Sequence, residues 1–340
     1  MANQAYLTAN SYLGLAKETT RGTVNTSATA QWIPVSSPQI TPQQKFLRDE
    51  ALRGSPSMVY DQVAGVRNDD VEFKAYAYAD SIGVILQSLL GATDTPTGTG
   101  PYTHTLRLLN SASTGSQPSS YSIQDFDGAN YFLITGAQAD SMTLAFGAEV
   151  AAEATMKFIG NPYTSSTTAS APFASYSTAT SQHPIPTWDT VATIGGTGYA
   201  NVMSGEIKLE RKTQPIFTMN GASGQSPFVN FAGPLDVSGK LTLVVSATND
   251  PFTTGSTAYG LTRSPQTMSL AMTDPNSPTA SYSLTLTGSS TQFQMVKRVR
   301  GKEFVEIEME FTCNANTTDG GGSVYSPLAA VLINGVAAGY

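Results

Sequence analysis

The clearest alternation of hydrophobic and polar positions lies at residues 304–311. Successive side chains on a β-strand point to opposite faces, so a strand here would separate two sets of residues. The apolar face would carry Val305, Ile307, Met309 and Phe311, and the acidic face Glu306, Glu308 and Glu310. An antiparallel sheet with one buried and one solvated face has this pattern. The stretch therefore predicts an antiparallel strand with a row of carboxylates on its outer face.

A related pattern occurs 153 positions earlier in the chain. Residues 142–161 align without a gap with residues 295–314, so that Glu153 corresponds to Glu306. Further matches follow in the same order, namely Ala64-Gly65 with Ala232-Gly233, Asp80 with Asn249 or Asp250, and Thr135-Gly136 with Thr287-Gly288. Self-similarity in a shared order predicts that a β unit is duplicated in tandem.

Runs of aromatic and β-branched residues predict further strands in both halves. They lie at 71–78, 103–109, 121–126, 131–135, 141–146 and 151–159, and then at 202–212, 239–246, 266–272, 281–287, 292–299 and 304–312. One helix is predicted near 81–90, where apolar residues recur at helical spacing. Asp80 is expected to be its N-cap and Gly91 to end it.

These elements predict a mainly β fold built from two units. Residues 1–162 would form the first β domain and 163–198 a connector rich in Ser, Thr, Ala and Pro. Residues 199–340 would form the second β domain with a C-terminal extension. In this half, Pro251–Leu261 is rich in Gly and Thr where the first half has its apolar helix, so we expect the second helix to be short or missing.

The amino-acid composition argues against several classes of function. Only 13% of the residues are charged, against an apolar share of 40%, which suggests a surface largely covered by a partner or by copies of the same chain. The net charge of −7 argues against general nucleic-acid binding, because phosphate affinity comes mainly from Lys and Arg. The single cysteine, Cys313, offers no disulfide framework. No apolar run predicts a signal peptide or a membrane span, so we expect a soluble chain without a membrane partner.

The usual catalytic motifs are not found in the sequence. His104 and His183 are its two histidines, and each is better explained as a structural hydrogen-bonding residue than as a base. Without a phosphate loop, a dinucleotide fingerprint or a metal-ligand set, we expect no cofactor, no metal and no enzymatic activity. Asp125–Asn130 lacks most ligands of a calcium loop and predicts a hairpin turn with local Asx hydrogen bonds.

Two explanations of the glutamate row remain open. The row is either a solvated face neutralised by Lys297, Arg298 and Arg300, or a functional acidic surface. Alternate glutamates on one strand lie about 7 Å apart, a separation that also suits an inverting glycosidase. Only two tryptophans are available as sugar platforms, so a carbohydrate-binding β-sandwich is the less favoured alternative.

A series of short segments carries a family resemblance. They are Ser11–Thr23, Arg53–Ser55, the predicted strand at 71–80, the helix ending in Leu89-Leu90-Gly91, Tyr102–Thr105, Tyr121–Asp125 and Gly136–Leu144. In this order they resemble the tail tube proteins of bacteriophages with long, non-contractile tails. The resemblance covers residues 11–160 directly, and the rest of the chain through its internal similarity.

The resemblance implies an antiparallel β-sandwich or half-barrel with a flanking helix. Copies would associate side by side until their inner sheets close into one β-barrel, which removes exposed sheet edges. Such rings would stack into a tube. Most members supply one domain to a six-part ring, so a duplicated chain would form a trimer with quasi-sixfold symmetry, with a hexamer as the alternative.

On this resemblance the chain is a structural subunit of the virion tail, assembled in the host cytoplasm around a tape measure protein. Tail terminator and distal tail proteins would bind the tube, and DNA would pass through its lumen without specific binding. Another virion structural protein, such as a baseplate or decoration protein, is the alternative.

Two groups of residues are the candidate sites of such a tube. Carboxylates repel phosphate, so we expect the lumen to be lined by Glu153, Glu306, Glu308 and Glu310. The C-terminal segment is apolar enough to dock, and contacts between rings are expected from Leu328, Val331, Leu332 and Ile333.

Overall fold

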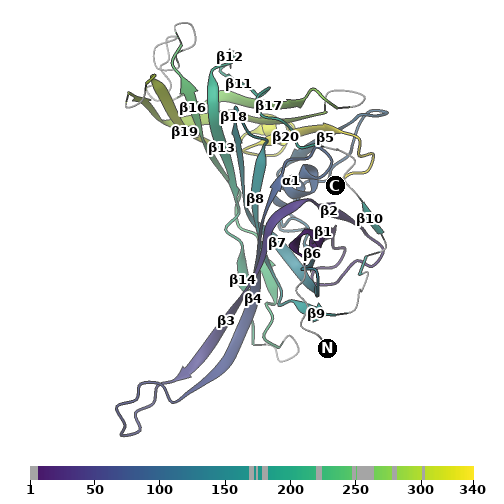
Figure 1. Ribbon diagram of the computed structural model, residues 1–340, viewed down its shortest axis with the longest axis vertical. Helices are drawn as coiled ribbons and strands as arrows, with labels where there is room; N and C mark the ends of the chain where they lie inside the picture. Colours follow the sequence, from purple (N-terminus) through teal and green to yellow (C-terminus); the bar gives the residue numbers. More distant parts are fainter. Residues whose placement is uncertain are drawn as a thin grey trace.

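The fold is mainly β and antiparallel, as the sequence predicted (Figure 1). The computed structural model describes residues 7–167, 172–173, 175–177, 183–219, 224–246, 250, 264–277, 282–300 and 303–340. The only helical elements in these ranges are the 3₁₀ turn η1 (Thr8–Asn10), helix α1 (Ile82–Leu90) and the short helix α2 (Thr317–Gly320). Pro251–Leu261, where the sequence predicted a short or missing second helix, lies outside the described residues.

One long sheet, called the main sheet below, runs through both halves of the chain. Its eight strands follow one another in the order β3 (Val35–Asp49), β4 (Asp61–Tyr76), β8 (Glu153–Gly160), β7 (Tyr131–Gly147), β13 (Val202–Glu210), β16 (Asp236–Val244), β19 (Glu306–Cys313) and β18 (Tyr282–Val299). All of these pairings are antiparallel. The two halves therefore meet at the β7–β13 pairing inside a continuous sheet.

Two outer sheets flank the main sheet, one for each half. The first is ordered β10 (Ser175–Ser177), β2 (Thr29–Ile33), β1 (Tyr12–Lys17), β6 (Tyr121–Phe126), the start of β7 and β9 (Thr164–Ser166). The second is ordered β12 (Thr197–Tyr199), β11 (Val191–Ile194), β17 (Gln266–Asp274), the start of β18, β20 (Ala329–Asn334) and β5 (Tyr102–Arg107). The predicted connector at 163–198 thus contributes β9, β10 and β11 to these sheets.

Strands β7 and β18 each cross from an outer sheet into the main sheet, and each joins two strands that the sequence predicted separately. Gly136 lies at the crossing in β7 and has a φ of 61°. A Cβ there would come within 2.9 Å of the Asn161 side chain, so the position requires glycine. The matching Thr287-Gly288 pair lies at the crossing in β18.

The strand order supports the predicted duplication, because the pairings β1–β2, β1–β6, β6–β7 and β7–β8 recur as β11–β12, β11–β17, β17–β18 and β18–β19. One detail of the gap-free alignment is wrong. Both long strands contain an irregularity, between Ala139 and Ser141 in β7 and between Phe293 and Met295 in β18. When these irregularities are matched, β7 aligns with β18 at an offset that is one residue larger than the offset that aligns β8 with β19.

Helix α1 is enclosed by the sheets, and all nine of its residues are buried. Gly91 ends it in the left-handed conformation, as predicted. The N-cap prediction is wrong, because Ser81 occupies that position and the Asp80 backbone carbonyl instead accepts a hydrogen bond from the Tyr340 hydroxyl at 3.2 Å. Arg211, from the second half, donates to the carbonyls of Leu89 and Leu90 at the helix end. Its burial lowers the pKa of Arg211 to about 10.

The main hydrophobic core contains residues of both halves, from Leu13 in β1 to Leu332 in β20. The division into domains at residues 162 and 198 stays a prediction. Two hairpins leave the main sheet at one end, and the larger one, formed by β3 and β4, extends well beyond the rest of the molecule (Figure 1). The smaller hairpin consists of β14 (Gln214–Ile216) and β15 (Val229–Phe231).

Candidate functional site

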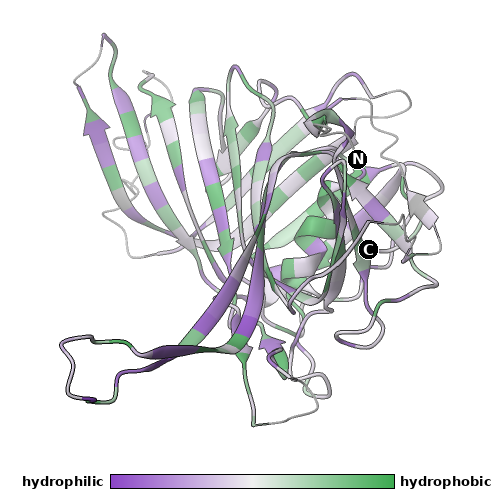
Figure 2. Ribbon diagram, turned by 60° about the horizontal axis from the view of Figure 1, so that its bottom comes forward, coloured by the Kyte–Doolittle hydropathy of each residue, from purple (hydrophilic) through white to green (hydrophobic). Residues whose placement is uncertain are grey.

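Hydrophobic and hydrophilic residues alternate along strands of the main sheet (Figure 2), which gives the sheet one apolar and one polar face. Cross-strand partners share a face, and the pairings carry the apolar face across the sheet from Phe73 through Met156, Met142 and Leu209. These side chains are all buried in the core. The opposite face is solvated and lined by charged and hydroxyl side chains, and it is called the polar face below.

The four glutamates expected in the lumen lie on this polar face. Glu153 is opposite Ala145, which is opposite Glu206, and Lys240 connects this row to Glu310. Glu306 and Glu308 follow on the same strand as Glu310, on the same face. Glu308 and Glu310 are accessible, whereas Glu306 is only 2% exposed. The structure thus places all four glutamates on one face of the sheet, with Glu306 buried and the other three accessible, and their place in a lumen stays a prediction.

Lysines interrupt the acidic surface along its whole width. The ion pairs are Lys74–Glu153 at 3.4 Å, Lys157–Asp70 at 3.0 Å, Lys157–Glu72 at 3.2 Å, Lys208–Glu210 at 2.7 Å, Lys297–Glu308 at 3.6 Å and Lys240–Glu308 at 4.0 Å. Exposed pairs of this kind contribute little to stability, about 0–1 kcal/mol each. Their main effect is on the electrostatic potential of the polar face, which stays negative because the carboxylates on this face outnumber the lysines.

The proposed neutralising residues behave differently from one another. Lys297 is near Glu308, as that explanation requires. Arg298 instead forms an ion pair with the buried Asp250, and its β19 partner Ile307 belongs to the apolar face. Neutralisation of the glutamate row is therefore partial.

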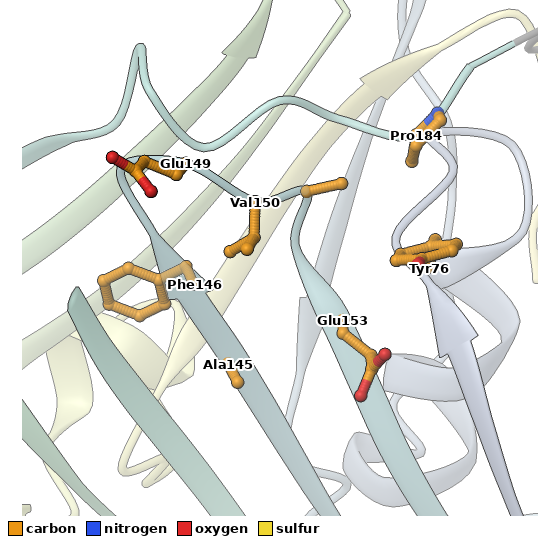
Figure 3. A pocket seen from close by; sticks show the side chains of 8 residues that line it. Tyr76, Ala145, Phe146, Glu149, Val150, Glu153 and Pro184 are labelled. Carbon is orange, nitrogen blue, oxygen red and sulfur yellow. The ribbon is translucent and has the colours of Figure 1, made fainter.

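A cleft of about 630 Å³ opens beside Glu153 (Figure 3). Its lining comes from the end of β4, the β7–β8 turn and a segment of the connector, and consists of Tyr76, Ala145, Phe146, Glu149, Val150, Ala151, Glu153 and Pro184. Because β4 runs from the hairpin to Tyr76, the cleft and the hairpin tip lie at opposite ends of the same strand.

The residues expected between rings contribute mainly to the chain's own fold. Leu328 and Leu332 are completely buried, which corrects their assignment to a surface contact. Val331 and Ile333 are half-buried on β20, between β18 and β5. The C-terminal segment does dock, as its apolar character predicted, but against its own sheet.

The hairpins carry several exposed apolar side chains that the sequence did not predict to be exposed. On β3, β4 and the turn between them these are Phe46, Leu47, Leu52, Met58 and Val63, and Met219 and Phe228 are exposed on the smaller hairpin. Gln225 of the smaller hairpin contacts β4, accepting a hydrogen bond from the Arg67 backbone N–H at 2.9 Å. The alternation in β3 is interrupted by Pro38 and Pro42, so the pattern did not predict a strand there.

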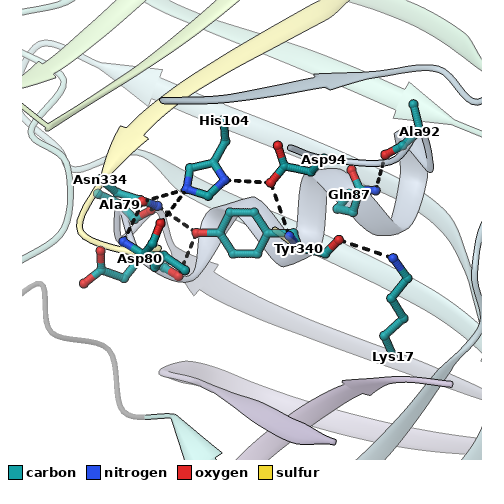
Figure 4. Close-up of polar contacts among 10 residues, drawn as sticks. Lys17, Ala79, Asp80, Gln87, Ala92, Asp94, His104, Asn334 and Tyr340 are labelled. Carbon is teal, nitrogen blue, oxygen red and sulfur yellow. Dashed lines mark hydrogen bonds and ion pairs between the residues drawn. The ribbon is translucent and has the colours of Figure 1, made fainter. Parts of the chain in front are cut away.

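His104 is a structural residue, as expected (Figure 4). Its Nδ1 is 2.6 Å from the Asp94 carboxylate, and its Nε2 is 2.9 Å from the Val336 carbonyl. The Tyr340 ring packs against His104, and its hydroxyl accepts a hydrogen bond from Asn334. Burial raises the pKa of Tyr340. These contacts fix the C-terminal segment against β5 and α1.

The stretch at residues 11–23 contains a buried carboxylate, that of Glu18. Glu18 is 6% exposed, and its two oxygens accept hydrogen bonds from the backbone N–H groups of Gly22 and Gly136 and the hydroxyls of Ser120 and Ser122, at 2.6–2.8 Å. Glu18 thereby holds the β7 crossing. The predicted Asx turn is also present, since Asp127 accepts hydrogen bonds from the two backbone N–H groups that follow in the turn.

The described residues contain no cluster of His, Cys, Asp and Glu suited to a metal ion. None of the helices in those same ranges has the length and apolarity needed to cross a bilayer.

Comparison with known proteins agrees with the architecture. No curated protein matches the chain. The family described as phage tail tube protein matches residues 8–313, which is nearly the whole sequence. Its members are structural proteins of the bacteriophage virion, consistent with a chain that has no enzymatic role. The chain belongs to the phage tail tube protein family.

Proposed function

We propose that this chain forms the tube of a long, non-contractile phage tail by closing into rings that stack around a hollow channel. The observation that carries the proposal is the main sheet, which takes strands from both halves of the chain and has one core face and one polar face. A sheet of this kind that continues from copy to copy buries its apolar side and turns its polar side toward one enclosed space.

The ring contains three chains in this proposal. Each chain supplies two related four-stranded parts to the main sheet, so three chains give six similar parts and quasi-sixfold symmetry. A ring of six chains is the alternative. The internal β7–β13 pairing supports the smaller number. It already joins two of the six parts within one chain, so only the joint to the next chain has to form between copies.

The polar face lines the channel, with Glu153, Glu306, Glu308 and Glu310 among its residues. Its excess of carboxylates prevents tight phosphate binding, while its lysines keep the repulsion moderate. Such a surface suits DNA that moves through the tube during delivery into the host. During assembly in the host cytoplasm the same channel surrounds the tape measure protein, and tail terminator and distal tail proteins bind the two ends.

Stacking of the rings uses the hairpins. The β3–β4 hairpin extends away from the body and exposes Leu52 completely and Met58 by 77%, and isolated chains rarely present such side chains together. The cleft beside Glu153 lies at the opposite end of the sheet. Head-to-tail stacking would cover both surfaces.

Negative-stain electron microscopy of the purified protein, with symmetry averaging of end views, tests the proposal. We expect hollow rings or tubes with three chains per ring. Six chains per ring would overturn the count but keep the tube. Monomers, shells or solid particles under every assembly condition would overturn the proposed function.

A further inference from the structure

The pairing of β7 with β13 is an internal joint between the two halves, and it shows how two main-sheet parts fit together. Seven residue pairs form it, from Ser204 opposite Gly147 to Glu210 opposite Ser141. Both faces continue across it. Thr143 lies opposite Lys208 on the polar face, and Leu144 lies opposite Ile207 in the core.

The outermost strands of the main sheet are the counterparts of these two joined strands. β3 corresponds to β13, since each is the outer neighbour of an equivalent strand and each has an irregularity near its start, after Ser36 and after Val202. β18 corresponds to β7, and matching the irregularities of the two strands places Val296 at the position of Met142. Among the described residues, no strand pairs with the outer side of β3, and beyond Thr291 none pairs with the side of β18 that faces away from β19.

We propose that β18 of one copy pairs antiparallel with β3 of the next copy in the register of the internal joint. This inference rests on the proposed ring and names its contact. Transferring the internal pairs through the duplication places Lys297 opposite Thr41, as Thr143 is opposite Lys208. It also places Val296 opposite Pro42, as Met142 is opposite Leu209.

The chemistry of the two edges matches this register. Thr41 is opposite Asp70 in β4, and Lys297 is opposite Glu308 in β19, so both belong to the polar face. Pro42 and Val296 belong to the apolar face, where Val296 already packs against the core. Lys297 would also face Asp70 two strands away, a distance of about 10 Å between Cα atoms that the two side chains can span. The joint therefore brings a basic edge to an acidic one.

Pro42 defines the hydrogen bonding of the joint. A proline cannot donate to a ladder, so its nitrogen side is expected to point away from β4, toward the outer edge. The neighbouring Thr41 then directs its backbone groups toward β4. Thr41 and the Lys297 opposite it therefore form a non-hydrogen-bonded pair, in which the Cα atoms lie about 4.5 Å apart. A disulfide can bridge that separation.

Paired cysteines in assembled protein test the register. We expect Thr41→Cys/Lys297→Cys to form disulfide-linked dimers and closed trimers on mild oxidation, visible on non-reducing gels. The matched control, Gln39→Cys/Lys297→Cys, is displaced by two residues on the same face and should cross-link at least tenfold less. The single-cysteine variants and the wild-type chain, whose Cys313 is buried, give the background.

A second measurement uses the unmodified chain. Carbodiimide treatment of wild-type tubes should join the Lys297 amine to the Asp70 carboxylate of a neighbouring copy, detected by mass spectrometry of mixed isotope-labelled and unlabelled subunits. Hollow rings in the microscope with cross-linking of the displaced pair, or of neither pair and no Lys297–Asp70 amide, would overturn the register while the tube stands. Failure of the wild-type chain to form rings would overturn the proposed function itself.

Discussion

Replacement of Glu18 tests whether one buried carboxylate holds the crossing of β7 between its two sheets. In Glu18→Ala the backbone N–H groups of Gly22 and Gly136 lose their acceptor, and so do the hydroxyls of Ser120 and Ser122. A buried donor left without a partner costs about 1–3 kcal/mol, and a hydroxyl can turn to another acceptor. We therefore expect Glu18→Ala to lower the free energy of unfolding by about 4 kcal/mol.

Glu18→Gln separates the loss of acceptors from the loss of volume. The glutamine has nearly the same shape, but its amide group must face either the Gly22 or the Gly136 N–H, and donor then opposes donor. We expect an intermediate loss of about 2 kcal/mol. The exposed Glu310→Gln is the matched control and should change stability by less than about 0.5 kcal/mol.

Urea unfolding followed by tryptophan fluorescence measures the effect, because Trp32 stacks on Tyr12 in the same outer sheet at 4.5 Å. The expected order of stability is wild type, Glu18→Gln, Glu18→Ala. Equal unfolding midpoints for wild type and Glu18→Gln, with unchanged slopes, would refute the idea that acceptor geometry at this site stabilises the crossing.

Three further predictions concern other parts of the fold. Gly83→Ala places a Cβ 2.2 Å from the Tyr340 ring, so we expect the free energy of unfolding measured in thermal melts to fall by about 2 kcal/mol. The loss should largely disappear in the Tyr340→Ala background, where alanine favours the helix, and an equal loss in both backgrounds would contradict this explanation. Burial, and next the charge of Asp127, raises the pKa of Asp125 from 3.8 to about 6, so the folded state is destabilised as pH rises from about 4 to 6. Asp125→Asn should therefore gain up to about 3 kcal/mol over wild type between pH 4 and pH 7, and a pH-independent difference would refute this. Replacing residues 50–60 by an Asn-Gly turn should leave rings intact but abolish stacked tubes in electron micrographs, whereas normal tubes would exclude the hairpin from stacking.

Sequence patterns predicted the fold best where one strand has two different faces. The alternation at 304–311 required a strand, and the repeat around Glu153 required a related one; both are present as β19 and β8. Strands β1, β2 and β3 were missed for physical reasons. Residues 13–16 of β1 are all buried, which removes the alternation, and β3 carries prolines and polar residues because much of it projects into solvent.

The candidate surface was harder to predict than the strands, because side-chain alternation fixes a face but not what the face meets. Alternation placed Glu308 and Glu310 together, and the duplication added Glu153, yet the lysines between them come from strands far apart in sequence. The C-terminal leucines show the opposite limit. Apolar character predicted that Leu328 and Leu332 are covered, but a partner ring and the chain's own sheet satisfy that requirement equally. Only the pairing of β20 with β18 and β5 decides between them, and the projecting hairpins instead expose apolar side chains that a partner could cover.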